Sequence, residues 1–160
     1  MIPAFDSQGV LPIGRYPATV AEIESRFVHT FPASMTRAGL FDGWRARREE
    51  LLDRVSIEWE WVDGSFVTSK SNAGDIDVAT FIQSDLLDEV DPTQRQRIFE
   101  LTVGSYPLIT FGCHSFLVVI FKPPHPLHPQ YLAQVGYWDR QWTADRSVAG
   151  KGYIEVREVQ

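Results

Sequence analysis

The chain has 160 residues and a formal net charge of −6, and 44% of its residues are hydrophobic. This length suits one domain with its own core, and the acidic balance argues against broad electrostatic binding to nucleic acid. Its single cysteine, Cys113, excludes an intramolecular disulfide framework and is compatible with a reducing compartment. We find no signal-peptide pattern at the N-terminus, and the longest apolar run, Phe116 to Phe121, is too short to span a membrane. We therefore expect a cytoplasmic protein.

Residues 1–35 are expected to form an extended N-terminal arm that carries one short helix. Three prolines and two glycines interrupt residues 1–18, and such a segment favours extended chain over helix. Thr19 and Glu22 have the spacing of a capping box, in which each side chain bonds the backbone amide of the other residue. They predict a helix that continues to about Phe27.

Residues 36–160 are expected to form a domain of alternating helices and strands. Apolar residues recur at helical spacing over 36–54, and alternation or β-branched runs mark the strands. Asp91 and Pro92 form an N-cap and first-turn pair that predicts another helix start. The first strand alternates, which predicts that Trp59 and Trp61 are buried while Glu58 and Glu60 face solvent. The predicted elements are, in chain order, a helix at 36–54, strands at 56–62 and 75–82, a helix at 91–103, a strand at 114–121, a helix at 129–142 and a strand at 152–159. This order predicts a single α+β domain in which helices flank a small mixed sheet.

Asp75 and Asp77 are the first candidate site. They are two residues apart on a predicted strand, so both side chains leave the same face. Two carboxylates held this close repel each other unless a cation lies between them. Mg²⁺ (or Mn²⁺) is the natural partner, because it accepts one or two carboxylates together with substrate phosphates and water. Without further support, the pair would be interpreted as solvated acids at the end of a strand.

Gly64 and Ser65 provide that support. They follow a predicted strand directly, and Phe66 to Lys70 are expected to form a short helix. Glycine lets a phosphate approach the backbone, while the Ser65 amide and hydroxyl and the helix N-terminus offer hydrogen-bond donors to an anion. Alone, the pair would be interpreted as a plain turn. Nine residues separate Ser65 from Asp75, enough for the chain to return, so the two motifs together predict a phosphate cradle that faces a metal-binding pair.

This arrangement resembles the signature of the polymerase-beta-type nucleotidyltransferase superfamily. That signature is an apolar residue, Gly, Gly or Ser, a gap of about this length, and an acidic pair flanked by apolar residues. Trp61–Ser65 and Asp75–Val78 have this pattern. The chain is also similar to a family of short nucleotidyltransferase-like proteins over nearly its whole length. The similar segments are Ile2–Phe5, Gly9–Pro12, Asp63–Lys70, Tyr137–Trp138 and Lys151–Glu155.

The resemblance implies an α/β-type nucleotidyltransferase core that binds a nucleoside triphosphate. In the superfamily, the paired acids and a third acid from a neighbouring strand bind two Mg²⁺ ions, which activate an acceptor hydroxyl and stabilise the leaving pyrophosphate. Carried over to this chain, Asp75 and Asp77 would be the catalytic metal ligands, and Gly64 and Ser65 would hold the terminal phosphates. Lys70 would help to neutralise phosphate charge, although a surface lysine without a specific role is the simpler interpretation.

The strand predicted at 114–121 lacks the third acid. His114 stands where the short family usually has Asp, and histidine prefers softer ions than Mg²⁺. His114 is therefore the nominal third ligand. Two functions stay open as a result. One is a minimal nucleotidyltransferase that acts on a protein or nucleic-acid acceptor, with a partner protein favoured; the other is a catalytically lapsed module that binds nucleotide or regulates a partner protein.

Other clusters favour structural interpretations. A zinc site is not favoured, because the adjacent Cys113 and His114 point to opposite faces of a strand, and His125 and His128 are expected in a proline-rich loop. Arginines of the 36–54 helix could contact RNA, but a solvated helix face is favoured. These arginines are Arg45, Arg47, Arg48 and Arg54. The aromatic residues expected in the core are Trp59, Trp61, Trp138 and Trp142.

Overall fold

The computed structural model describes residues 1–144 and 150–157. At its centre is a five-stranded mixed sheet with the strand order β1-β5-β2-β3-β4. β1 is parallel to β5 and β3 to β4, whereas β2 is antiparallel to both of its neighbours. The strands are β1 (Arg15–Ala18), β2 (Trp59–Asp63), β3 (Ile76–Gln83), β4 (Cys113–Ile120) and β5 (Tyr153–Val156). The expected α+β domain with a small mixed sheet is confirmed.

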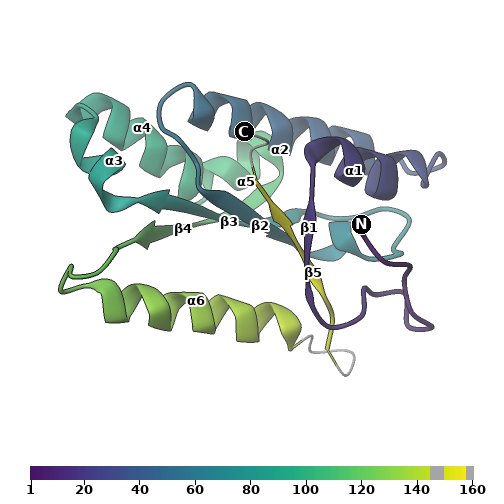
Figure 1. Ribbon diagram of the computed structural model, residues 1–160. Coiled ribbons are helices and arrows are strands. Elements are labelled where there is room, and N and C mark those ends of the chain that lie inside the picture. The colour runs from purple at the N-terminus through teal and green to yellow at the C-terminus, as the bar shows by residue number, and fades with distance from the viewer. Residues whose placement is uncertain (145–149, 158–160) are drawn as a thin grey trace.

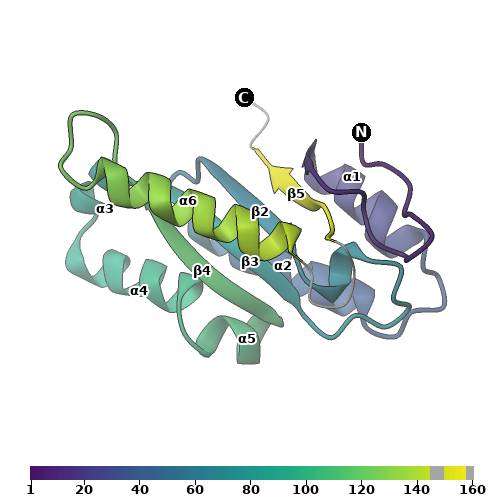
Figure 2. The same cartoon turned by 90° about the horizontal axis from the view of Figure 1, so that it is seen from below.

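Helices cover both faces of this sheet (Figure 1). Helix α6 (His128–Thr143) lies along one face, and α1, α2 and α4 lie on the other. In the view of Figure 2, from the α6 side, β4 is at the opposite edge of the sheet from β1 and β5. The other helices are α1 (Val20–Glu24) with its π-helical continuation η1 (Ser25–His29), α2 (Arg37–Leu52), the 3₁₀ turn η2 (Ser65–Val67), α3 (Ser84–Glu89), α4 (Pro92–Thr102) and α5 (Tyr106–Phe111).

Two helices begin where the sequence predicts. Thr19 Oγ1 accepts a hydrogen bond from the Glu22 amide at 3.2 Å, and Glu22 Oε2 accepts one from the Thr19 amide at 2.9 Å. Asp91 Oδ1 accepts from the amides of Thr93 and Gln94 at 2.8 and 3.0 Å. The capping box of α1 and the aspartate cap of α4 are thereby confirmed, and each satisfies amides that have no partner within their helix.

The structure also contains elements that the sequence analysis did not predict. Residues 15–18 of the expected arm form β1, which pairs with β5. Helices α3 and α5 have six residues each, too short to show periodicity. The short helix expected at 66–70 is reduced to the 3₁₀ turn η2 at Ser65–Val67. His128 begins α6 instead of lying in the loop. The strand predicted at 152–159 is shorter, ending at Val156, and residues 158–160 lie outside the described part of the chain.

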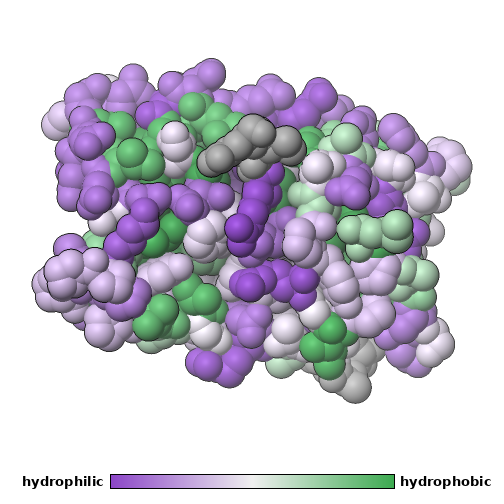
Figure 3. Space-filling view, viewed as in Figure 1, coloured by the Kyte–Doolittle hydropathy of each residue, from purple (hydrophilic) through white to green (hydrophobic). Residues whose placement is uncertain are grey.

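The core fills both sides of the sheet. On the α6 side it is aromatic: the Trp61 ring lies 4.7 Å from Phe81 and 5.0 Å from Tyr153, between centroids. Trp142 is buried in the same cluster, and Trp59 and Trp138 pack against it. The expectation that these tryptophans belong to the core is confirmed. The outer surface seen in Figure 3 is mostly hydrophilic, with apolar side chains in small separate groups.

Strand β2 is buried on both faces, so the prediction of a half-buried strand is wrong. Glu60, which was expected to face solvent, has 0% of its surface exposed. Its Oε1 accepts from Arg47 Nη1 at 2.8 Å, and its Oε2 accepts from Arg48 Nη1 at 2.9 Å. Arg47 and Arg48 are therefore buried, and the prediction of a solvated face on α2 is wrong for them. An alternating pattern of charged and aromatic residues does not show whether the charged residues face solvent or form a buried ion pair.

Arg47 connects this ion pair to three other elements. Its Nε donates to the carbonyl of Leu101 in α4 at 2.7 Å, and its Nη2 donates to Thr80 Oγ1 of β3 at 2.8 Å and to Ser115 Oγ of β4 at 2.6 Å. Burial alone would raise the pKa of Glu60, but Arg48 and Arg47 outweigh it and hold that pKa below its usual range. The carboxylate is therefore charged at neutral pH.

We expect Glu60→Gln to lower the free energy of unfolding by about 3–5 kcal/mol, because it leaves the buried Arg47 without its carboxylate partner. Urea denaturation at neutral pH measures this loss. Glu50→Gln is the matched control, since Glu50 pairs with Arg97 and Arg54 at 2.8 and 3.2 Å near the surface. The control should lose less than about 1 kcal/mol. Similar losses for the two variants would contradict the central role of the buried pair.

Candidate functional site

The acidic motif lies in a row across three neighbouring strands. Asp77 on β3 is the Cα partner of Asp63 on β2 and of His114 on β4. Laterally paired residues of a sheet share a face, so these three side chains leave the sheet on the same side. On the same face, the next residues of the three strands are Trp61 and Ala79, which belong to the aromatic cluster under α6, and Phe116, which packs against it. The row therefore lies at the end of the face that α6 covers.

Asp75, Asp77 and His114 form a cluster that could hold a cation. His114 Nδ1 lies 3.1 Å from Asp75 Oδ2 and 3.1 Å from Asp77 Oδ1. One ligand atom from each residue lies within 4.8 Å of the others, and all three side chains are partly buried. The structure thus brings together the three residues that the sequence proposes as metal ligands.

The electrostatics of Asp77 suit a cation. Burial raises the pKa of this carboxyl group above its usual range, and the negative charge of Asp75 raises it further, while His114 opposes both effects. A divalent cation between the carboxylates would remove the repulsion and replace the lost hydration.

Gly64 places the turn after β2 directly against Asp77. Its φ is +83°, a backbone conformation that side chains rarely adopt. A Cβ at this position would lie 3.1 Å from the Asp77 amide nitrogen and 3.1 Å from Asp77 Oδ2. Any other residue would be strained and would crowd the carboxylate. The glycine of the motif is therefore required by its close contact with the acid.

Ser65 joins this turn to the chain that precedes the acids. Its Oγ accepts a hydrogen bond from the Gly74 amide at 3.0 Å, which leaves the hydroxyl proton for a second partner. The helix N-terminus expected here is only the three-residue turn η2, too short for a substantial macrodipole. The anion donors that the sequence predicts here are therefore reduced to the backbone of the turn and the Ser65 hydroxyl.

Lys70 is exposed, and no contact of the described residues joins its ammonium group to the cluster. Its carbonyl accepts from Arg37 Nη2 at 2.7 Å. Arg37 is buried, donates also to the carbonyls of Phe27, Phe66 and Thr68, and its pKa is lowered to about 10 by burial. Arg37 therefore holds the loop between the Gly64 turn and the acids in a fixed path.

Lys151 is a cation at the site that the sequence analysis missed. Its Nζ lies 2.9 Å from Asp63 Oδ1 and donates to the Gly64 carbonyl at 3.1 Å, and the residue is 7% exposed. It therefore fixes the turn from behind. The signal that could have identified it is the similarity of the segment from Lys151 to Glu155 to the short family, but no spacing connects that segment to Gly64.

Asp63, the partner of Lys151, titrates near neutrality. Burial raises its pKa to about 7, and although Lys151 lowers it, Asp77 raises it further. The charge at this end of β2 therefore changes in the physiological range of pH.

We expect the wild type to lose stability relative to Asp63→Asn as the pH rises from about 5 to about 8. The folded-state pKa of about 7 lies above the usual value of 3.8, so the folded chain keeps a proton that the unfolded chain releases. That stabilisation is complete below the unfolded pKa and is lost as the pH passes through the folded pKa. The expected change is on the order of 2 kcal/mol.

Urea denaturation of both proteins at the two pH values, without metal, measures this change. A difference in unfolding free energy that stays constant with pH would show that Asp63 is ionised throughout the range.

The chain belongs to the DUF6932 family, a family of unknown function, which matches residues 3–157. No curated protein and no solved structure matches it. Within residues 1–144 and 150–157, we find no helix with the length and hydrophobicity that a membrane span requires.

Proposed function

We propose that this chain binds a nucleoside triphosphate together with a divalent cation, Mg²⁺ or Mn²⁺, and transfers its nucleotide to an acceptor. The observation that carries this proposal is the contact between the Gly64 turn and the acid pair. A Cβ at Gly64 would lie 3.1 Å from Asp77 Oδ2, so a phosphate on the turn would be within reach of a cation on Asp75 and Asp77. Asp75 and Asp77 would hold such a cation, and it would supply positive charge to the phosphate.

The donor atoms of the cluster fit one such ion. The carboxylates of Asp75 and Asp77 are oxygen ligands, which Mg²⁺ and Mn²⁺ prefer, and they leave coordination positions for water and phosphate. The nitrogen of His114 suits these ions less well than a third carboxylate would. A bound cation would neutralise phosphate charge and stabilise the leaving pyrophosphate.

In the transfer reaction, the residues of this chain would bind and orient the substrates. The amides of the Gly64 turn and the Ser65 hydroxyl would donate to the terminal phosphates. The acceptor oxygen would form a bond to the α-phosphorus while the bond to pyrophosphate breaks, and its proton would pass to water or to a carboxylate. We propose a partner protein as the acceptor, because the net charge of −6 favours a protein over a nucleic acid. We also propose a cytoplasmic location, with which the single cysteine is compatible.

His114 favours a second candidate function, a catalytically lapsed module that binds nucleotide or regulates a partner protein. Its ring nitrogen lies 3.1 Å from both carboxylates, where a third acid would be needed to hold a second cation. A hydrogen bond from Nδ1 would partly satisfy the acids without any metal. Binding with one cation and without transfer is the outcome that this function predicts.

Nucleoside triphosphates should raise the melting temperature of the wild type only when Mg²⁺ or Mn²⁺ is present. Thermal-shift and calorimetric titrations with each triphosphate, with and without metal, measure this. The double variant Asp75→Asn, Asp77→Asn should lose the effect, because amides do not replace the negative charge that holds the cation.

The matched control is Asp88→Asn, Glu89→Gln, which removes two exposed acids from the end of α3. It should respond to nucleotide like the wild type. Equal stabilisation of the wild type and the Asp75, Asp77 double variant would mean that nucleotide binds elsewhere.

His114→Asp should strengthen Mg²⁺ binding by about tenfold or more, because it adds a third oxygen ligand and a negative charge. His114→Asn, which adds an oxygen without the charge, is the control. Calorimetric titration of Mg²⁺ into the three proteins measures the affinities. Transfer of label from an α-labelled nucleotide to a partner should rise in parallel.

Two results would separate the functions. Label transfer by the wild type that is abolished in Asp77→Ala supports the enzyme, since loss of a metal ligand removes several kcal/mol of transition-state stabilisation. Nucleotide binding without transfer supports the lapsed module. If His114→Asp binds Mg²⁺ no better than the wild type, His114 is not at the metal site.

A further inference from the structure

Strand β4 has one edge without a strand partner among the described residues. The Ile76 amide donates to the Gly112 carbonyl at 3.1 Å. This bond determines which residues of β4 direct their backbone groups to β3 in the parallel pairing. Alternate residues from His114 to Ile120 therefore direct their backbone groups to β3. The residues between them direct their N–H and C=O groups to the outer edge, and these are Ser115, Leu117 and Val119.

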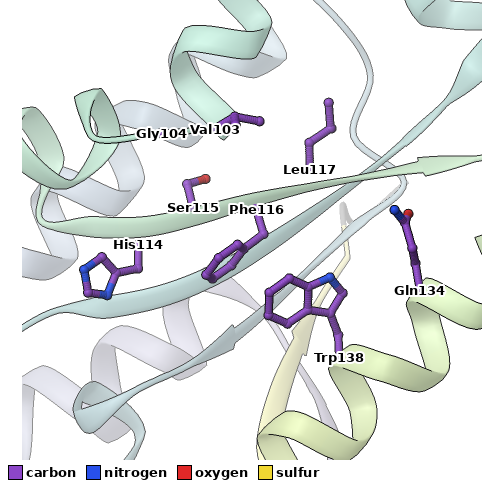
Figure 4. A pocket seen from close by; sticks show the side chains of 8 residues that line it. All are labelled: Val103, Gly104, His114, Ser115, Phe116, Leu117, Gln134 and Trp138. Carbon is purple, nitrogen blue, oxygen red and sulfur yellow. The ribbon is translucent and has the colours of Figure 1, made fainter.

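A cavity of about 440 Å³ lies along this edge. In Figure 4, His114 and Phe116 point to one side of β4, where α6 contributes Trp138. Ser115 and Leu117 point to the other side, where Val103 and Gly104 lie above the strand. Because the cavity is lined from both faces of one strand, it lies beside the strand's edge rather than over a face of the sheet.

The edge is recessed. None of the residues Cys113–Ile120 is fully exposed, since each is buried or partly buried. One extended chain is narrow enough to enter such a groove between helices. A second copy of this protein would have to bring its own recessed β4 into the groove. The helices beside the two strands would then keep them from approaching to the spacing of about 4.8 Å that pairing requires. A ligand without a peptide backbone would leave the outward N–H and C=O groups of β4 unpaired.

Apolar side chains border the groove on both sides. Val103 lines it on the α4 side and is 51% exposed. On the α6 side, the exposed Tyr137 lies against Trp138, with 5.1 Å between ring centroids. Exposed apolar residues that border an unpaired strand indicate a site for another polypeptide.

We propose that the outer edge of β4 binds an extended segment of a partner protein as an additional strand. Main-chain hydrogen bonds to Ser115, Leu117 and Val119 provide the pairing, and alternate side chains of the segment enter the two sides of the groove. The groove begins at His114, so the segment passes beside the acid cluster. That this segment is the acceptor of the nucleotide is an inference that rests on the proposed function, whereas its binding to β4 does not.

The probe is a displayed library of random peptides of 8 residues, the length of β4, selected on the wild type without nucleotide or metal. We expect the selected peptides to have apolar residues at alternate positions, since alternate side chains face the same side of the groove. Synthetic copies are then N-methylated at either the odd or the even positions, and their binding is measured by fluorescence polarisation. One set should lose about tenfold in affinity for each methyl group and the other set little, because only one edge of the peptide pairs with β4.

Two variants at Leu117 test whether the peptide pairs with the outer edge of β4. Leu117→Pro removes an outward N–H without removing a bond to β3, and Leu117→Ala keeps that N–H while shortening the same side chain. Leu117→Pro should lose peptide binding by about tenfold or more, and Leu117→Ala by much less. Should the proline variant fail to fold, the N-methylated peptides still test the pairing. The double variant Asp75→Asn, Asp77→Asn should bind peptide like the wild type, so failure of the nucleotide site would not affect this result.

Three outcomes would overturn the proposal. They are a selection that yields no peptide above background, equal binding of both N-methylated sets, and a wild-type dimer in sedimentation experiments that Leu117→Pro dissociates. The last would assign the edge to a second copy of this chain.

Discussion

The guanidinium group of Arg47 is the constraint on which the central sheet most depends. From α2 it reaches the side chains of Glu60, Thr80 and Ser115, one on each of β2, β3 and β4. These strands therefore have a fixed register, held from the face opposite to the acid cluster. A slip of one residue would turn every side chain of a strand to the other face and would remove His114, the neighbour of Ser115, from the carboxylates.

The acid cluster lies between Lys151 and His114. The Lys151 ammonium lies 2.9 Å from Asp63 on the β2 side, and the His114 ring nitrogen lies 3.1 Å from Asp77 on the β4 side. A cation that bound Asp75 and Asp77 would compete with these nitrogen groups for the carboxylates. Its affinity would be the difference between the two sets of interactions, so the arrangement is compatible with both proposed functions.

How far the sequence predicts this structure depends on how local each feature is. The helix starts at Thr19 and Asp91 and the meeting of Gly64 with the acids follow from short motifs, because the contacts involved are between near neighbours or adjacent strands. β1 depends on β5 at the other end of the chain, and Lys151 acts on Gly64 across 87 residues. The exposure of Glu60 was predicted wrongly because its burial depends on Arg47 and Arg48 of helix α2, which the alternation of β2 does not reveal.

The parallel pairing of β1 with β5 has a consequence for how the site forms. Arg15 pairs with Tyr153 and Ala18 with Val156, so the sheet closes only when segments far apart in the chain meet. Such long-range contacts form late, because closing the loop between them costs entropy before any contact compensates for it. The same C-terminal segment carries Lys151 to the Gly64 turn. During synthesis, a nascent chain that ends before this segment contains both acids and the glycine turn, yet its turn has no lysine behind it.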